Sequence, residues 1–452
     1  MNSIKIKKGL DICIAGTAEK TVSAMPSTTD FAVKPIDYVG LNPRLLVGEG
    51  DNVTAGTILF VDKNNPDARF ASPVDGMVKA IVRGEKRALL AVVVERTDDA
   101  AQQPLCTPER LAAMNRDEMV DTMVELGLWT LLRQRPFGII PQRDSHPKAV
   151  FVSAFDSSPL PVDYAFILDN DDFQKGIDIL ASVGAKVHLG LSAKNDNAFL
   201  ENIKNAEIHH FDGPHPAGLT GTHIAFVDPI NKGETVWTVN AQDVATIGHF
   251  FRTGLYKPER TVAFCGTLVE KPQYYRTTAG ASISALAAMV KPQNGHAPRF
   301  ISGDVLSGLS IAADGFISAQ CDKISVLPEG DYYDFMGWLR PNFRKFSFSR
   351  TFLSGFLSKF KCKNSKFTFD TGRHGDHRPL FVTGEFEKLV PLNIYPMQLI
   401  KACIVGDIEL MEELGIYEVE PEDLALCEFA DTSKTEIQAI LRNALEKIRK
   451  ED

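Results

Sequence analysis

The chain has 452 residues, of which 44% are apolar and 24% charged, as in an ordinary folded globular protein. This length exceeds what a single core supports, so we expect several domains. The net charge of −9 excludes general nucleic-acid binding, and the absence of an apolar run of about 18–20 residues predicts no membrane-spanning helix.

Residues 1–106 form an N-terminal region, in which short apolar runs separated by Gly, Pro and Asn predict β-strands between Asp37 and Glu95. Its strand–turn–strand units resemble the barrel-sandwich module of biotinyl and lipoyl carriers. In those carriers a lysine on a tight hairpin holds the prosthetic group, and Lys63 falls near that place. A proline-broken loop surrounds Lys63 and no Met-Lys-Met triplet is present, so we interpret the module as structural, with acylation of Lys63 as the alternative.

A charged helical connector is expected at 107–136, followed at 137–256 by alternating strands and helices. This alternation predicts a Rossmann-like α/β domain with a largely parallel sheet. A helix carrying Phe173, Ile177 and Leu180 on one face should end at Gly184. The other expected elements are strands at 149–155, 186–191, near 208 and at 224–228, and a helix at 197–204.

The second half of the chain changes character twice. Residues 257–330 place strands near 260 and 299 around a helical stretch at 282–290, an order that resembles the soluble-ligand-binding β-grasp (SLBB) fold. A basic, Phe-rich segment is expected at 331–390. Residues 391–452 predict a C-terminal helical domain, with apolar residues at helical spacing in 392–414 and 434–448.

The usual signs of a resident cofactor are missing. No Gly-x-Gly-x-x-Gly motif follows the first strand of the α/β domain, and no P-loop is present. The seven cysteines are scattered without a Cys-x-x-Cys motif, so we expect neither a zinc site nor an iron–sulfur cluster. We interpret His209, His210, His215, His374 and His377 as solvated loop residues and assign no catalytic or metal-binding residue.

The most distinctive stretch runs from Arg340 to Arg378. It holds ten Lys or Arg and two Asp, a net charge of +8, so the rest of the chain carries −17. It also holds eight of the 28 phenylalanines, several of them at helical spacing. A basic amphipathic element suits an anionic membrane surface or an acidic partner; packing onto the protein's own core is the alternative. The expected membrane or partner face consists of Arg350, Phe352, Phe356, Lys359, Phe360, Lys361, Lys363 and Lys366.

Four motifs resemble, in the same order along the whole chain, the A subunit of the sodium-translocating NADH:quinone reductase. They are Lys5-Ile-Lys-Lys-Gly-Leu-Asp, Ser72-Pro-Val-Asp-Gly-Met-Val, Phe300-Ile-Ser-Gly-Asp-Val-Leu-Ser-Gly and Val390-Pro-Leu-Asn-Ile-Tyr-Pro. The layout is similar to that of the Rnf C subunit, as well as to that of the flavoprotein of complex I. Here the stretch 135–141 lacks the glycines with which that flavoprotein binds FMN. The Rnf C subunit carries cysteine quartets for iron–sulfur clusters in its C-terminal helices. In this chain only Cys403 and Cys427 lie in that region, and we leave their role open.

The resemblance implies a peripheral subunit on the cytoplasmic face of the bacterial inner membrane. It would belong to a six-subunit complex that oxidises NADH, reduces ubiquinone and pumps sodium ions. This subunit would bind no cofactor, with FAD, FMN, riboflavin and iron–sulfur centres on the other subunits. Its chief partner would be the membrane subunit with covalent flavin, and a contribution to the quinone site is open. The alternatives are the carrier acylated at Lys63 and a flavin- or NADH-binding dehydrogenase subunit.

Replacing Lys359, Lys361 and Lys363 by glutamate should weaken assembly with the membrane subunits, most strongly at low salt. Each basic residue near an acidic leaflet contributes about 1 kcal/mol, and salt screens this attraction beyond about 8 Å at physiological ionic strength. Co-purification at several salt concentrations measures the effect, while the melting temperature of the isolated chain should not change. Normal assembly at low salt would place the basic face elsewhere, and an unfolded variant would assign the stretch to the core.

Overall fold

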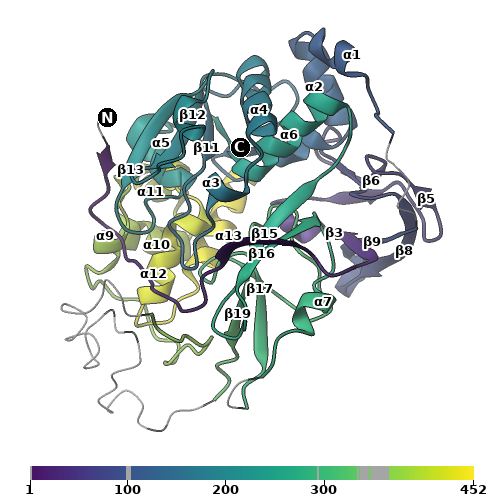
Figure 1. The fold of residues 1–452 in the computed structure, drawn as a ribbon. Helices are drawn as coiled ribbons and strands as arrows, with labels where there is room; N and C mark the ends of the chain where they lie inside the picture. The colour runs from purple at the N-terminus through teal and green to yellow at the C-terminus, as the bar shows by residue number, and fades with distance from the viewer. Residues whose placement is uncertain are drawn as a thin grey trace.

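The structure, a computed structural model, describes residues 3–97, 103–292, 295–332, 335, 346, 348 and 366–451, and every statement below concerns these residues. Figure 1 shows a β module on one side, an α/β layer, a second large sheet beside it and a group of C-terminal helices. The predicted multidomain α/β and β architecture is therefore confirmed. The residues 349–365, which include seven of the eight predicted partner-face residues, lie outside the described chain.

Two antiparallel sheets form the barrel-sandwich module, with strand orders β3-β9-β8-β5 and β4-β6-β7. Phe60 and Phe70 are fully buried in it and stack with ring centroids 4.7 Å apart. Gly76 lets β8 approach β9, because a Cβ there would lie 2.1 Å from the Glu95 carbonyl oxygen. The strands are β3 (Asp30–Val33), β4 (Pro43–Leu45), β5 (Asn52–Val53), β6 (Ile58–Asp62), β7 (Arg69–Ala71), β8 (Gly76–Arg83) and β9 (Leu89–Arg96).

The α/β domain is a six-stranded sheet with the order β1-β13-β12-β11-β14-β10, parallel except that β10 runs antiparallel to β14. Helices α4 (Asn170–Val183) and α6 (Ala241–Thr253) pack on one face, and α5 (Thr220–Val227) packs against Phe151 on the other. Because both faces are covered, β11 is continuously apolar. The strands are β1 (Ile4–Lys5), β10 (Arg133–Arg135), β11 (Val150–Ser153), β12 (Val187–Ser192), β13 (Glu207–Asp212) and β14 (Val236–Asn240).

Two predicted elements of this domain were wrong. The expected strand at 224–228 is the end of helix α5, because a short apolar run fits either element and periodicity does not separate them. The expected helix at 197–204 shrinks to one turn, η4 (Leu200–Asn202). There the side chain of Asn197 accepts hydrogen bonds from the amides of Phe199 and Leu200, a local turn that competes with a longer helix. The sequence analysis also missed β14 and α6.

The β-grasp sheet has the order β18-β17-β19-β15-β16-β2. Its helix α7 (Ser284–Ala287) is shorter than the predicted stretch 282–290. Strand β2 precedes the barrel sandwich in the chain, as does β1 of the α/β sheet. The segment 4–24 therefore joins the sheets of two later domains. The strands are β2 (Glu19–Ala24), β15 (Glu259–Cys265), β16 (Gln273–Thr278), β17 (Pro298–Ser302), β18 (Leu309–Ile311) and β19 (Lys323–Pro328).

The predicted C-terminal domain is helical. The predicted connector at 107–136 is helical only in its first part, because its end forms strand β10 of the α/β sheet. The C-terminal helices surround a core that includes Leu399, Leu441 and Leu445, all fully buried. In the described part of the chain, no helix combines the length and the apolar character needed to cross a membrane. The helices are α1 (Pro108–Ala112), α2 (Arg116–Glu125), α9 (Phe386–Leu389), α10 (Pro396–Val405), α11 (Ile408–Glu413), α12 (Ala425–Ala430) and α13 (Ile437–Glu451).

Helices α4 and α6 touch through two glycines. A Cβ at Gly176 would lie 2.0 Å from the carbonyl oxygen of Val244, and one at Gly248 would lie 1.8 Å from that of Asp172. Both distances are far below van der Waals contact, so any larger residue must push the helices apart.

Replacing Gly248 by alanine should lower the free energy of unfolding by about 1–3 kcal/mol, because the added methyl group overpacks this contact. Ser182→Ala, on the exposed side of α4, is the matched control and should change stability by less than about 0.5 kcal/mol. Chemical denaturation of both variants measures the difference. If the two were equally stable, the helices would be free to separate.

Candidate functional site

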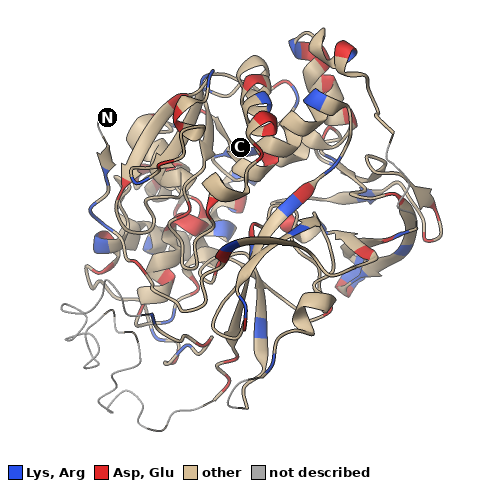
Figure 2. Ribbon diagram, in the orientation of Figure 1, with Lys and Arg blue, Asp and Glu red and all other residues tan. Residues whose placement is uncertain are grey.

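A cavity of about 500 Å³ lies at the carboxyl ends of β11 and β14. The chain runs from β11 to β12 on one side and later returns to β14 on the other, so the strand order reverses at this point. In open α/β sheets, ligands bind at such a switch point. Residues of the β-grasp domain and of the C-terminal helical domain complete most of the wall, and Val39 of the N-terminal region also lines it, so four domains meet around the cavity. Figure 2 shows acidic and basic positions next to one another where these domains meet.

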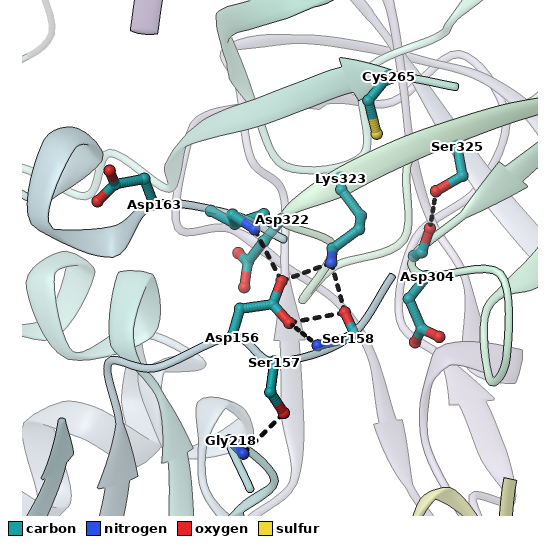
Figure 3. A network of polar contacts seen from close by, with 12 residues as sticks. Asp156, Ser157, Ser158, Asp163, Gly218, Cys265, Asp304, Asp322, Lys323 and Ser325 are labelled. Carbon is teal, nitrogen blue, oxygen red and sulfur yellow. Dashed lines mark hydrogen bonds and ion pairs between the residues drawn. The ribbon is translucent and has the colours of Figure 1, made fainter. Parts of the chain in front are cut away.

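Lys323, at the start of β19, joins the β-grasp domain to the loop that follows β11. Its Nζ donates to Asp156 Oδ2 at 2.5 Å and to Ser158 Oγ at 2.6 Å (Figure 3). Burial alone would lower the pKa of this lysine, but Asp156 outweighs burial and raises the pKa above its ordinary value. The pKa of Asp156 falls in turn, against the effect of burial. Both groups therefore stay charged, and the pair is a fixed part of the wall.

Asp322, the neighbour of Lys323, makes the second connection. Its carboxylate accepts hydrogen bonds from the Tyr164 hydroxyl at 2.6 Å, the Asn240 amide at 2.5 Å and the Gln242 amide at 2.6 Å. Tyr164 begins the short helix α3 (Tyr164–Ile167), and the other two donors lie at the end of β14 and the start of α6. The dipeptide at 322–323 thus holds both sides of the switch point.

The C-terminal domain is attached by two arginines. Arg135, only 5% exposed, donates to Asp423 Oδ2 at 2.8 Å and to Glu422 Oε1 at 2.5 Å. Arg442 of α13 donates to Glu420 Oε2 at 2.5 Å and to the carbonyl oxygen of Phe137 at 2.8 Å. The stretch 135–141, in which the sequence lacked the FMN-binding glycines, therefore anchors the helical domain.

This lining does not fit a nucleotide phosphate. Among the described lining residues, the basic side chains of Lys323, Arg135 and Arg442 are already paired with carboxylates, and Arg133 lies over the ring of Tyr38 and donates to backbone carbonyls. An anion in this cavity would lie near five carboxylates, and none of the described basic lining residues is free to compensate its charge. The carboxylates are those of Asp156, Asp304, Asp322, Glu420 and Glu422.

The interpretation of three histidines as solvated loop residues was wrong. His209 and His210 lie in strand β13, and His210 binds Glu201 at 2.9 Å. His215 is buried, and its Nδ1 lies 3.1 Å from Ser157 Oγ. The sequence did contain a signal for strand β13. His209 and His210 stand between the apolar residues Ile208 and Phe211, in a run that has the length of a strand. His374 and His377 are exposed.

The sequence analysis also missed a cluster of side chains on β12 and β13. His188, Glu207 and His209 offer ligand atoms that lie within 4.8 Å of one another. His188 Nδ1 is 2.9 Å from His209 Nε2 and 3.6 Å from Glu207 Oε2. Burial lowers the pKa of both histidines, so they are neutral near pH 7. The two residues are 21 positions apart, and only the parallel register brings them together.

Lys63 is exposed on the loop between β6 and β7, where the resemblance to carriers placed it. That loop is fastened to the stretch 140–141 by the side chain of Asn65, which donates to the carbonyl oxygen of Pro141 at 3.3 Å. Of the predicted partner face only Lys366 is described, and it is exposed. Just beside it, Phe369 lies 6.4 Å from Phe429 of α12, so the end of the Phe-rich segment packs on the helical domain.

Cys403 and Cys427 are free thiols in the helical domain. Burial raises the pKa of both, that of Cys403 to about 12. A buried thiol with a raised pKa is a poor nucleophile and a poor metal ligand.

The comparisons with known proteins agree along the whole chain. Family models described as the NqrA N-terminal barrel-sandwich hybrid domain, the NqrA second alpha/beta domain and the NQRA C-terminal domain match residues 4–97, 114–256 and 261–312. The A subunit of the Na(+)-translocating NADH-quinone reductase of Neisseria meningitidis serogroup B is 41% identical, over 99% of this chain and 100% of that protein. The corresponding proteins of Hahella chejuensis and Haemophilus influenzae are 39% and 38% identical over the same shares.

Among solved structures, an NAD+-reducing [NiFe]-hydrogenase in its H2-reduced state matches with 12% identity and a TM-score of 0.37, covering 75% of this chain and 64% of that chain. A likeness at this level carries no functional argument. The full-length relatives and the three family models do. The chain belongs to the family of A subunits of the Na(+)-translocating NADH-quinone reductase.

Proposed function

We propose that this chain works as a peripheral docking subunit of a sodium-pumping NADH:quinone reductase and carries no flavin, nicotinamide nucleotide or iron–sulfur cluster of its own. The observation that supports this proposal is the lining of the switch-point cavity. At the edge where related folds bind nucleotides, Lys323 and Arg135 serve to hold neighbouring domains together. Redox cofactors then belong on the other subunits.

We place the protein on the cytoplasmic face of the membrane, against the membrane subunit that carries covalent flavin. The basic stretch between Arg340 and Arg378 supports this placement, since its charge of +8 contrasts with −17 in the rest of the chain. A contribution to quinone reduction would use the switch-point cavity. Its volume is that of a small-molecule site, and Phe155 and Leu219 give it apolar surface for an uncharged ring.

The purified chain should show no visible flavin absorbance and should contain no stoichiometric iron. Among the described residues, we find no site suited to bind a flavin phosphate or an iron–sulfur cluster. A tagged chain should recover the other reductase subunits from solubilised membranes, as identified by mass spectrometry. The assembled complex, measured in the same way, is the positive control for flavin and iron. Flavin that survives gel filtration with the isolated chain would favour the rival function, a dehydrogenase subunit that binds flavin or NADH.

Lys63→Ala should leave intact mass, melting temperature and quinone reductase activity of the complex unchanged. The side chain is exposed and surface substitutions usually change stability by less than about 0.5 kcal/mol. Asn65→Ala is the informative comparison, because it removes the contact that fastens the same loop. It should lower the melting temperature slightly. A mass increase on the unmodified chain that disappears in Lys63→Ala would establish the carrier function instead.

A further inference from the structure

The cluster of His188, Glu207 and His209 lies outside the switch-point cavity, on the face of the sheet that α5 covers. Strands β12 and β13 are parallel neighbours there (Figure 1), and His188 pairs in register with Glu207. Side chains two apart on a strand point to the same face, so Glu207 and His209 both face the side of His188. Phe151 of β11 stacks on the His188 ring at 4.8 Å and fixes its orientation.

The spacing of the ligand atoms suits a tetrahedral cation. Zinc binds imidazole and carboxylate at about 2.0–2.2 Å, which puts two tetrahedral ligands about 3.3–3.5 Å apart. The separations of 2.9 Å, between His188 Nδ1 and His209 Nε2, and 3.6 Å, between His188 Nδ1 and Glu207 Oε2, lie on either side of that value, and the ligand atoms of all three residues lie within 4.8 Å of one another. Two imidazoles and one carboxylate are also a common zinc ligand set, with the fourth position left for water.

The contacts within the cluster are ones that a metal ion can replace. One ring nitrogen of His188 and His209 donates to the other across 2.9 Å. When a cation takes that place, the donating ring moves this proton to its other nitrogen. Glu207 is ion-paired with Lys186. Lys186 is the competitor for this carboxylate, and its side chain is 63% exposed and free to leave.

A third imidazole lies over the same face. His223 of α5 takes the space above Gly190, the register partner of His209. It is buried, and its Nδ1 has no hydrogen-bond partner among the described residues. This buried nitrogen is a further polar group on the face of the sheet that carries the cluster.

We propose that His188, Glu207 and His209 form a binding site for one divalent transition-metal ion of the zinc class, with a solvent-open coordination position. This assignment revises the expectation from sequence that the chain binds no metal. It does not depend on the proposed docking function. The side chain of Glu207 is half exposed, so the ion reaches the site from solvent without unfolding the sheet.

The test uses the full chain after treatment with a chelator, titrated with Zn²⁺ and with Co²⁺ as a spectroscopic probe. One zinc ion per chain should bind, and the cobalt form should show tetrahedral absorption without thiolate charge transfer. Glu207→Gln and His209→Gln should each weaken binding by more than the roughly 10–100-fold that loss of an outer-shell partner costs. His210→Gln, which changes the next residue on the opposite face, should bind zinc as the unmodified chain does.

Lys186→Ala separates the metal site from the ion pair, because it should tighten zinc binding while Glu207→Gln weakens it. Melting temperatures without metal show whether each variant is folded. If His209→Gln unfolds, Glu207→Gln decides the test, because the Glu207 side chain is half exposed and its replacement should not disturb folding. Failure of the unmodified chain to bind zinc saturably overturns the proposal. Binding that is unchanged in both Glu207→Gln and His209→Gln, or that shows thiolate ligation, overturns it as well.

Discussion

The ion pair between Lys323 and Asp156 is largely buried and joins the β-grasp domain to the α/β domain, beside a hydrophobic core that both domains share. A buried pair gives little net stability, because the cost of removing both charges from water offsets their attraction, whereas loss of one partner costs about 3–5 kcal/mol. Such a pair mainly fixes geometry. The next residue, Asp322, binds Asn240 and Gln242 at the other side of the switch point. The start of β19 therefore sets where the β-grasp domain sits on the α/β sheet.

A buried ion pair also holds the C-terminal helical domain in place. Arg135 is buried against Asp423 and would be left unpaired if this domain moved away. Its contacts, together with that of Arg442 to the carbonyl oxygen of Phe137, attach the stretch 135–141 to the helical domain. The cations of Arg135 and Lys323 are thus committed to attaching neighbouring domains.

Sequence alone predicted the four kinds of domain and the elements with strong periodicity or clear ends, such as α4 with its stop at Gly184. The prediction from sequence failed where an element or a contact depends on residues far apart in the chain. The run at 224–228 has the length of a strand, and its helical state depends on packing against Phe151. His188 and His209 meet only through the register of two parallel strands. The pairing of Lys323 with Asp156 spans 167 positions, a separation that composition and spacing do not reveal.

The segment 4–24 has a consequence for synthesis on the ribosome. Its two strands pair with β13 and β16, at residues 211–212 and 273–276. All strands of the barrel sandwich lie at 30–96, before the strands with which β1 and β2 pair. The barrel sandwich can therefore fold while β1 and β2 still lack their partner strands. Domains usually fold in the order in which they emerge. Strands β1 and β2 are therefore made before the barrel sandwich but can pair only after strands of both later sheets have been made.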